Sequence, residues 1–123
     1  MAKTTHDDVL DGALSIIKNN ATQISACSAQ PTTYEEATDT YMLAIKSDLT
    51  SADFVVADDT SGRKVTVATQ AAVEIEDSGT AVYIALCDVD DRLLAVTTCN
   101  SQALVDGNTV TFPAWKIGIA DPT

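Results

Sequence analysis

The sequence predicts a mainly β protein with one N-terminal helix, folded as an antiparallel β-sandwich or a small barrel. Apolar residues at helical spacing are concentrated in the first 20 residues. From residue 53 onward, short alternating segments recur about every 8–17 residues between Asp-, Ser- and Gly-rich turns, a spacing typical of Ig-like and jelly-roll-like sandwiches. We therefore expect one domain over 1–123, with a helix at 5–20, a helix/strand connection at 22–50 and an antiparallel β region at 53–120.

The N-terminal helix is indicated by both of its ends and by its apolar positions. Thr5 can act as N-cap, with Asp8 in the capping-box position three residues later. Lys18 and the two asparagines after it are typical of a helix C-terminus. The stripe at spacings of three and four consists of Val9, Leu10, Ala13, Leu14, Ile16 and Ile17. It must be buried against the chain's own sheet or against a neighbouring subunit.

The connection combines strands with a helical turn. Residues 22–27 alternate as a short strand, which Gln30-Pro31 ends. A capping box predicts a helical turn near 33–38, and residues 41–45 alternate again.

In the β region, residues 80–87 are mostly apolar on both faces, which predicts a central strand covered on both sides. Further strands are expected at 64–69, 72–75, 93–98, 109–112 and 115–119.

Three aspartates, Asp88, Asp90 and Asp91, lie between two of these predicted strands. A helix-flanked calcium loop needs alternating acids, then a glycine and a distal glutamate. This segment has no glycine, and Arg92 stands where more oxygen ligands are needed. Since Asp is also a common turn residue, a hairpin is the favoured interpretation. A binding module with acidic calcium loops at 58–62, 76–79 and 88–91 stays as an alternative.

The sequence offers no metal, cofactor or catalytic constellation. Cys27, Cys87 and Cys99 are odd in number and widely spaced, so we expect free, mostly buried thiols, although Cys87 and Cys99 could approach each other at strand ends. Together with His6, expected to be exposed, they do not supply a zinc geometry.

Pairs of carboxylates are the candidate groups for acid–base chemistry in this sequence. Asp58 with Asp59, or Glu74 with Glu76, could serve a small hydrolase, but a solvated face is favoured among 18 acids. The pair Arg63-Lys64 is expected at a solvated strand start. We expect no catalytic residue and no cofactor, and therefore a protein that is not an enzyme.

The charge balance limits the partners. Eighteen acids against seven bases give a net charge of −11 and a pI near 4.1. Such a surface repels phosphates, so we expect no nucleic-acid partner and no anionic membrane surface. No apolar run reaches about 20 residues and no secretory signal is evident, which indicates synthesis in a reducing cytoplasm.

The order of segments resembles a family of small structural proteins of tailed-bacteriophage virions. The S-G-T-A…A-L block and the later G-N-T-V-x-F-P-A strand are its most recognisable part. The segments that carry the resemblance are M-A-K-T-T-H-D-D-V-L-D-G-A-L, C-S-A-Q-P-T-T-Y-E-E-A, D-D-T-S-G-R-K-V-T-V-A, S-G-T-A-V-Y-I-A-L and Q-A-L-V-D-G-N-T-V-T-F-P-A-W-K-I-G-I-A-D-P.

This resemblance implies a non-enzymatic virion component made in the host cytoplasm. The leading expectation is a capsid decoration (cement) protein on the capsid surface, bridging major capsid subunits, with the major capsid protein and/or copies of itself in a homo-oligomer as partners. A tail or tail-tip role is the alternative. The single tryptophan, Trp115, is either a core or edge aromatic or an interface anchor. The interface candidates are Val9, Leu10, Leu14, Ile17, Phe112, Trp115 and Ile117.

Overall fold

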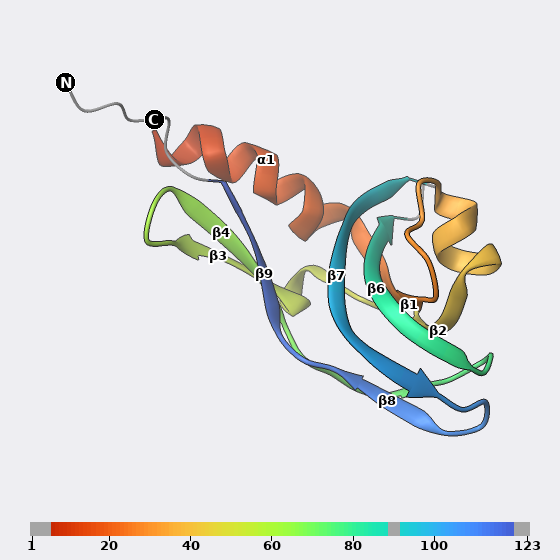
Figure 1. The fold of residues 1–123 in the computed structure, drawn as a ribbon. Coiled ribbons are helices and arrows are strands. Elements are labelled where there is room, and N and C mark those ends of the chain that lie inside the picture. Colours follow the sequence, from red (N-terminus) through yellow and green to blue (C-terminus); the bar gives the residue numbers. More distant parts are fainter. Residues whose placement is uncertain (1–5, 89–91, 120–123) are drawn as a thin grey trace.

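The structure, a computed structural model, describes residues 6–88 and 92–119 (Figure 1). In chain order its elements are α1 (Asp7–Asn20), β1 (Ala21–Cys27), a π-helical turn (Glu36–Thr40), β2 (Met42–Lys46), a 3₁₀ turn (Ser51–Asp53), β3 (Phe54–Asp58), β4 (Arg63–Val67), β5 (Gln70–Glu74), β6 (Gly79–Asp88), β7 (Leu93–Leu104), β8 (Thr109–Phe112) and β9 (Trp115–Ile119). The predicted fold class is confirmed: the chain is mainly β, antiparallel, with one N-terminal α-helix.

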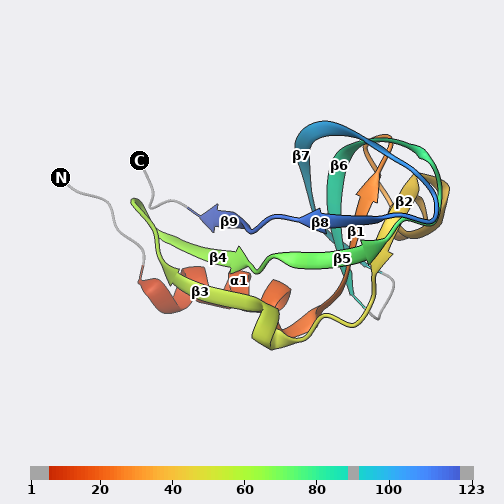
Figure 2. The ribbon, with the colours of Figure 1, turned by 90° about the horizontal axis from the view of Figure 1, so that it is seen from below.

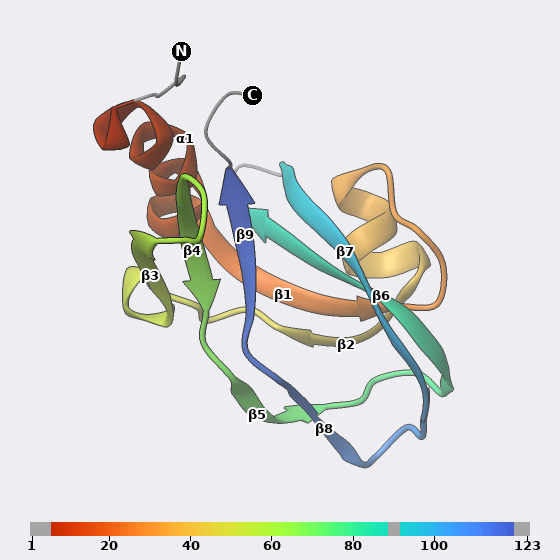
Figure 3. The same ribbon diagram turned by 60° about the vertical axis from the view of Figure 1, so that its left-hand side comes forward.

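The strands form three antiparallel sheets of four, three and two strands. Their orders are β2-β1-β6-β7, β3-β4-β9 and β5-β8. Figures 2 and 3 show β4 and β5 running on into each other beside β9 and β8, so that the two smaller sheets make one bent ribbon facing the larger sheet. A bridge between Ala44 and Ile75 links β2 to β5. The arrangement is sandwich-like, and the described strands do not close into a barrel.

The main core fills the space between the ribbon, the large sheet and α1. Its largest fully buried side chains include Phe54, Leu14, Ile24 and Leu86. Val65 and Val67 of β4 share this interior, opposite Val56 and Phe54 of β3. The helix therefore packs against its own chain, since Leu14 and Ile17 contact this core.

A second, smaller core covers the opposite face of the large sheet. It contains Cys27, Ala37, Ala85 and Cys87, and lies under the π-helical turn. The predicted central strand at 80–87 is thus confirmed, because β6 lies between β1 and β7 and is covered on both faces.

Ion pairs hold α1 on the ribbon. The Arg63 guanidinium donates to Asp11 of α1 (Nε to Oδ1, 2.8 Å) and to Asp58 of β3 (Nη1 to Oδ1, 2.7 Å). These two carboxylates raise the pKa of Arg63. The expectation of a solvated strand start was wrong for Arg63, because its side chain points to the same face as Val65 and meets the helix there.

The N-terminal end of α1 is capped by another residue than the predicted one, whereas its C-terminal end has the predicted lysine in the last turn. His6, which is exposed as predicted, is the N-cap and accepts a hydrogen bond from the Asp8 N–H; Thr5, the predicted cap, lies outside the described residues. Lys18, in the last turn, donates through Nζ to the carbonyls of Ser51 and Phe54 at 3.0 and 2.7 Å.

The predicted hairpin between β6 and β7 is confirmed by their antiparallel pairing. The Asp88 N–H donates to the Arg92 carbonyl, and the buried Asp88 carboxylate accepts from the Arg92 N–H and Nε. Asp90 and Asp91 lie outside the described residues. Within the described ranges, no three His, Cys, Asp or Glu side chains form a group that could hold a metal ion.

Candidate interaction surfaces

The outward face of α1 carries an exposed apolar stripe. Val9 is 65% exposed and Ile16 is 49% exposed, and Gly12 and Ala13 lie exposed between them. Positions i, i+3, i+4 and i+7 share one side of a helix, so these four residues form a continuous surface, here called the outer stripe.

The sequence predicted a single stripe, and the structure divides it. Leu10 and Leu14 are buried, and Ile17 packs against the core. At about 100° per residue, the six apolar positions cover too wide an arc for one sheet face to bury. Of the helical interface candidates, only Val9 is therefore widely exposed.

The C-terminal interface candidates are placed mostly in the chain's own core. Phe112 is buried, and Trp115 and Ile117 are half-buried against the main core. Trp115 fits both interpretations in part, because its ring packs inward while it also borders a surface hollow. Its Nε1 is buried and has no hydrogen-bond partner among the described residues.

β7 presents a long free edge. It is 12 residues long and, among the described strands, pairs only with β6. Its sequence L-L-A-V-T-T-C-N-S-Q-A-L contains no charged residue and no proline. Natural sheets usually protect such edges with charges, proline or short strands. Sequence analysis missed this edge, although the run of 12 uncharged residues in a chain with 20% charged residues was a usable signal.

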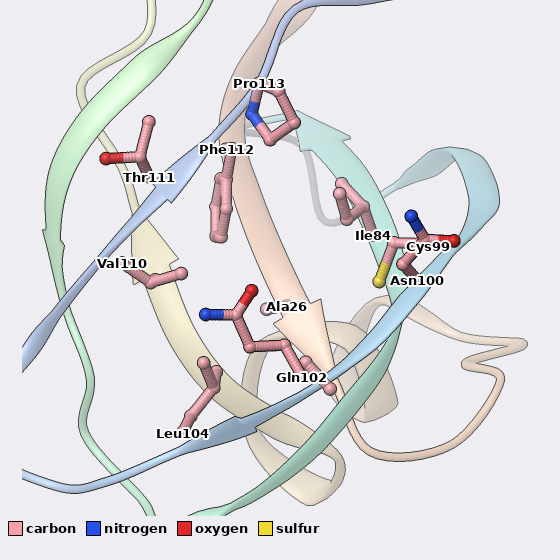
Figure 4. A pocket seen from close by; sticks show the side chains of 11 residues that line it. Ala26, Ile84, Cys99, Asn100, Gln102, Leu104, Val110, Thr111, Phe112 and Pro113 are labelled. Carbon is pink, nitrogen blue, oxygen red and sulfur yellow. The ribbon is translucent and has the colours of Figure 1, made fainter.

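A cavity of about 220 Å³ lies beside this edge, between β7 and β8 (Figure 4). Figure 4 shows Phe112, Val110 and Leu104 directed into the space, with Gln102 at its centre. A neighbouring hollow of about 380 Å³ shares Cys99, Asn100 and Pro113 and reaches Trp115 and Lys116. Residues of β7 and β8, two strands that are consecutive in sequence, therefore line the first cavity together.

The lining of these two hollows contains no carboxylate, in a chain with 18 acids. Lys116 is its only ionic residue, and its Nζ lies 2.8 Å from both carboxylate oxygens of Asp59. The surface between β7 and β8 is therefore an uncharged region of a strongly acidic molecule.

The carboxylate pairs considered for acid–base chemistry are engaged elsewhere. Asp58 binds Arg63, and Asp59 binds Lys116, whose ammonium group lowers the pKa of the Asp59 carboxyl. An acid held ionised in this way is a poor proton donor near neutral pH. Glu74 and Glu76 are exposed beside a shallow hollow of about 400 Å³.

The three thiols are free, and the two that could have met lie apart. Cys87 belongs to the small core, whereas Cys99 packs against the main core on the opposite face of the sheet. Burial raises the pKa of Cys87 to about 11, and it also raises the pKa of Cys27 and Cys99. Such thiols are poor nucleophiles.

No family model, curated protein or solved structure matches the chain. No helix among the described residues is long and apolar enough to cross a membrane.

Proposed function

We propose that this chain is a non-enzymatic structural component of a tailed-phage virion, a capsid decoration protein that bridges major capsid subunits. The resemblance of its segments to small virion proteins supports this function. The observation that carries it is the outer stripe of α1, an apolar surface that is exposed in the described part of the chain.

The outer stripe suits a contact made in an assembly. Removing a Val or Ile side chain from water is worth about 1.5–3 kcal/mol, and the stripe offers one of each, separated by small residues that allow close approach. A single stripe of this size gives weak binding. Repetition over the symmetry-related sites of a capsid, together with contacts to two neighbouring subunits, raises the avidity.

The acidic surface also fits this role. A net charge of −11 keeps copies of the chain apart in solution at high concentration and favours a basic or neutral partner surface. The engaged carboxylates and the protonated thiols give no support to catalysis.

The test is co-sedimentation of the purified chain with isolated heads and, separately, with isolated tails of the encoding phage. We expect saturable binding to heads. Ile16→Glu should weaken it about tenfold or more, because a charge would be buried at the contact. Val55→Glu is the matched control, since Val55 is 58% exposed and lies on β3, outside the outer stripe.

Unchanged head binding by Ile16→Glu would remove the helix from the contact. Binding of the wild-type chain to tails alone would reassign it to a tail component. Binding to neither particle would contradict the proposed function.

A further inference from the structure

β7 and β8 are neighbours along the chain that do not pair. The four residues 105–108 join them, with Gly107 at a φ of 92° and a hydrogen bond from the Asn108 N–H to the Val105 carbonyl (3.1 Å). Consecutive strands joined by so short a turn usually form a hairpin. Here β7 pairs with β6 and β8 with β5, and Figure 4 shows the two strands running apart around the cavity.

Bulges in β7 and in β5, the partner of β8, account for this divergence. In β7, residues 99–101 stand opposite Val82 alone. In β5, Ala71 and Ala72 stand opposite Thr111 alone, and Ala72 has a φ of 57°. Extra residues bend a strand and increase its twist. The opening is therefore built into β7 and into the β5–β8 pair.

The opening has the features that an added strand requires. On one side, the free edge of β7 offers backbone N–H and C=O groups over 12 uncharged residues. Beneath it, the cavity accepts side chains among Ile84, Leu104 and Phe112. The amides of Asn100 and Gln102 in its lining offer hydrogen bonds. The buried Trp115 Nε1, which has no partner among the described residues, lies beside the neighbouring hollow.

We propose that an extended, uncharged segment of the capsid subunit adds to the free edge of β7 as a further strand and covers the cavity between β7 and β8. This inference rests on the proposed function and names a second contact element beside the outer stripe of α1. Main-chain hydrogen bonds to β7 supply the affinity, and alternate side chains entering the cavity select an apolar or small residue at every second position.

The occupant belongs to a different protein rather than to a second copy of this chain. Pairing of the β7 edges of two copies would bring together two chains that each carry a net charge of −11. An uncharged extended arm or loop of a capsid subunit does not meet this repulsion.

The experiment measures head binding of Gln102→Lys and hydrogen exchange of the bound wild-type chain. Gln102 is exposed on β7 and lines the cavity, so a lysine there places a charge against the incoming strand. Gln30→Lys is the matched control, an exposed amide in the loop after β1. Both variants are first checked for wild-type circular dichroism and melting temperature.

We expect Gln102→Lys to bind heads about tenfold or more weakly, Gln30→Lys to bind normally, and the amides of 98–104 to gain protection on heads. Normal binding by Gln102→Lys, with protection confined to α1, would overturn the strand addition and leave the proposed function standing. A dimer of the free chain that Gln102→Lys dissociates would make the occupant a second copy. Failure of the wild-type chain to bind heads would remove the proposed function and this inference with it.

Discussion

At the residue scale, opposite charges rather than apolar contacts tie the surface of the ribbon together. Lys116 of β9 and Asp59, just after β3, form an ion pair across β4, the strand that lies between β3 and β9. Arg63 joins α1 and β3 in the same region through Asp11 and Asp58. These cations are few, since the chain has seven Lys and Arg against 18 acids, so each pairing also relieves local repulsion.

The Asp59–Lys116 pair predicts a pH dependence of stability. Because the pKa of Asp59 is lowered in the folded chain, its contribution is complete above the ordinary value of 3.8 and is lost as the pH falls through the lowered value. We expect wild type to be more stable than Lys116→Met at pH 6, with the difference shrinking below pH ~3.8. Urea unfolding at both pH values measures it, and a constant difference would contradict the pairing.

The burial of the three thiols leads to a second prediction at this scale, the order in which they are alkylated. Burial leaves Cys27 and Cys87 protonated and inaccessible, whereas Cys99 is only half-buried. We expect iodoacetamide at pH 8 to modify Cys99 first and the other two only on unfolding. Peptide mass spectrometry over time reads this directly, and equal rates at all three thiols would contradict the two-core arrangement.

At the element scale, the apolar face of α1 has one part that is packed against the core and one part that is exposed. The side with Leu10, Leu14 and Ile17 is packed, and Arg63 and Lys18 fix its orientation. The adjoining side, which carries the outer stripe, remains exposed. Spacing alone showed that six apolar residues lie on the helix, but it could not show which of them the sheet would cover.

Gly12 in the middle of the outer stripe gives a stability prediction. A Cβ added there meets no atom within 4 Å, and the position is interior to the helix. Gly12→Ala should therefore stabilise the fold by about 0.5–1 kcal/mol, through the smaller backbone entropy lost on folding. A denaturant titration measures the change, and destabilisation would show that the helix is not formed as described.

At the scale of the whole molecule, the sequence predicted what depends on local pattern. The N-terminal helix, the central strand β6 and the β6–β7 hairpin follow from periodicity and turn chemistry, and all three are present. The pairing of Arg63 with Asp11, 52 residues away, could not be predicted, since it depends on how the helix crosses the ribbon. The opening between β7 and β8 could not be predicted for the same reason, because bulges and strand order are set by packing across the whole chain.

The molecule as a whole therefore combines a well-packed interior with two uncharged surfaces, the outer stripe and the β7 edge, on an otherwise acidic exterior. A bridging protein needs at least two contact surfaces, and we propose the outer stripe and the β7 edge as these two.

The central claim is that the chain decorates capsids, and the stoichiometry of head binding tests it most directly. Purified chain is titrated onto isolated heads, and the copies retained per particle are counted after sedimentation. The account predicts saturation at a fixed number set by icosahedral symmetry, reduced occupancy for Ile16→Glu at the same concentration, and no such plateau on tails. Retention that rises without a plateau, or no retention at all, would contradict it.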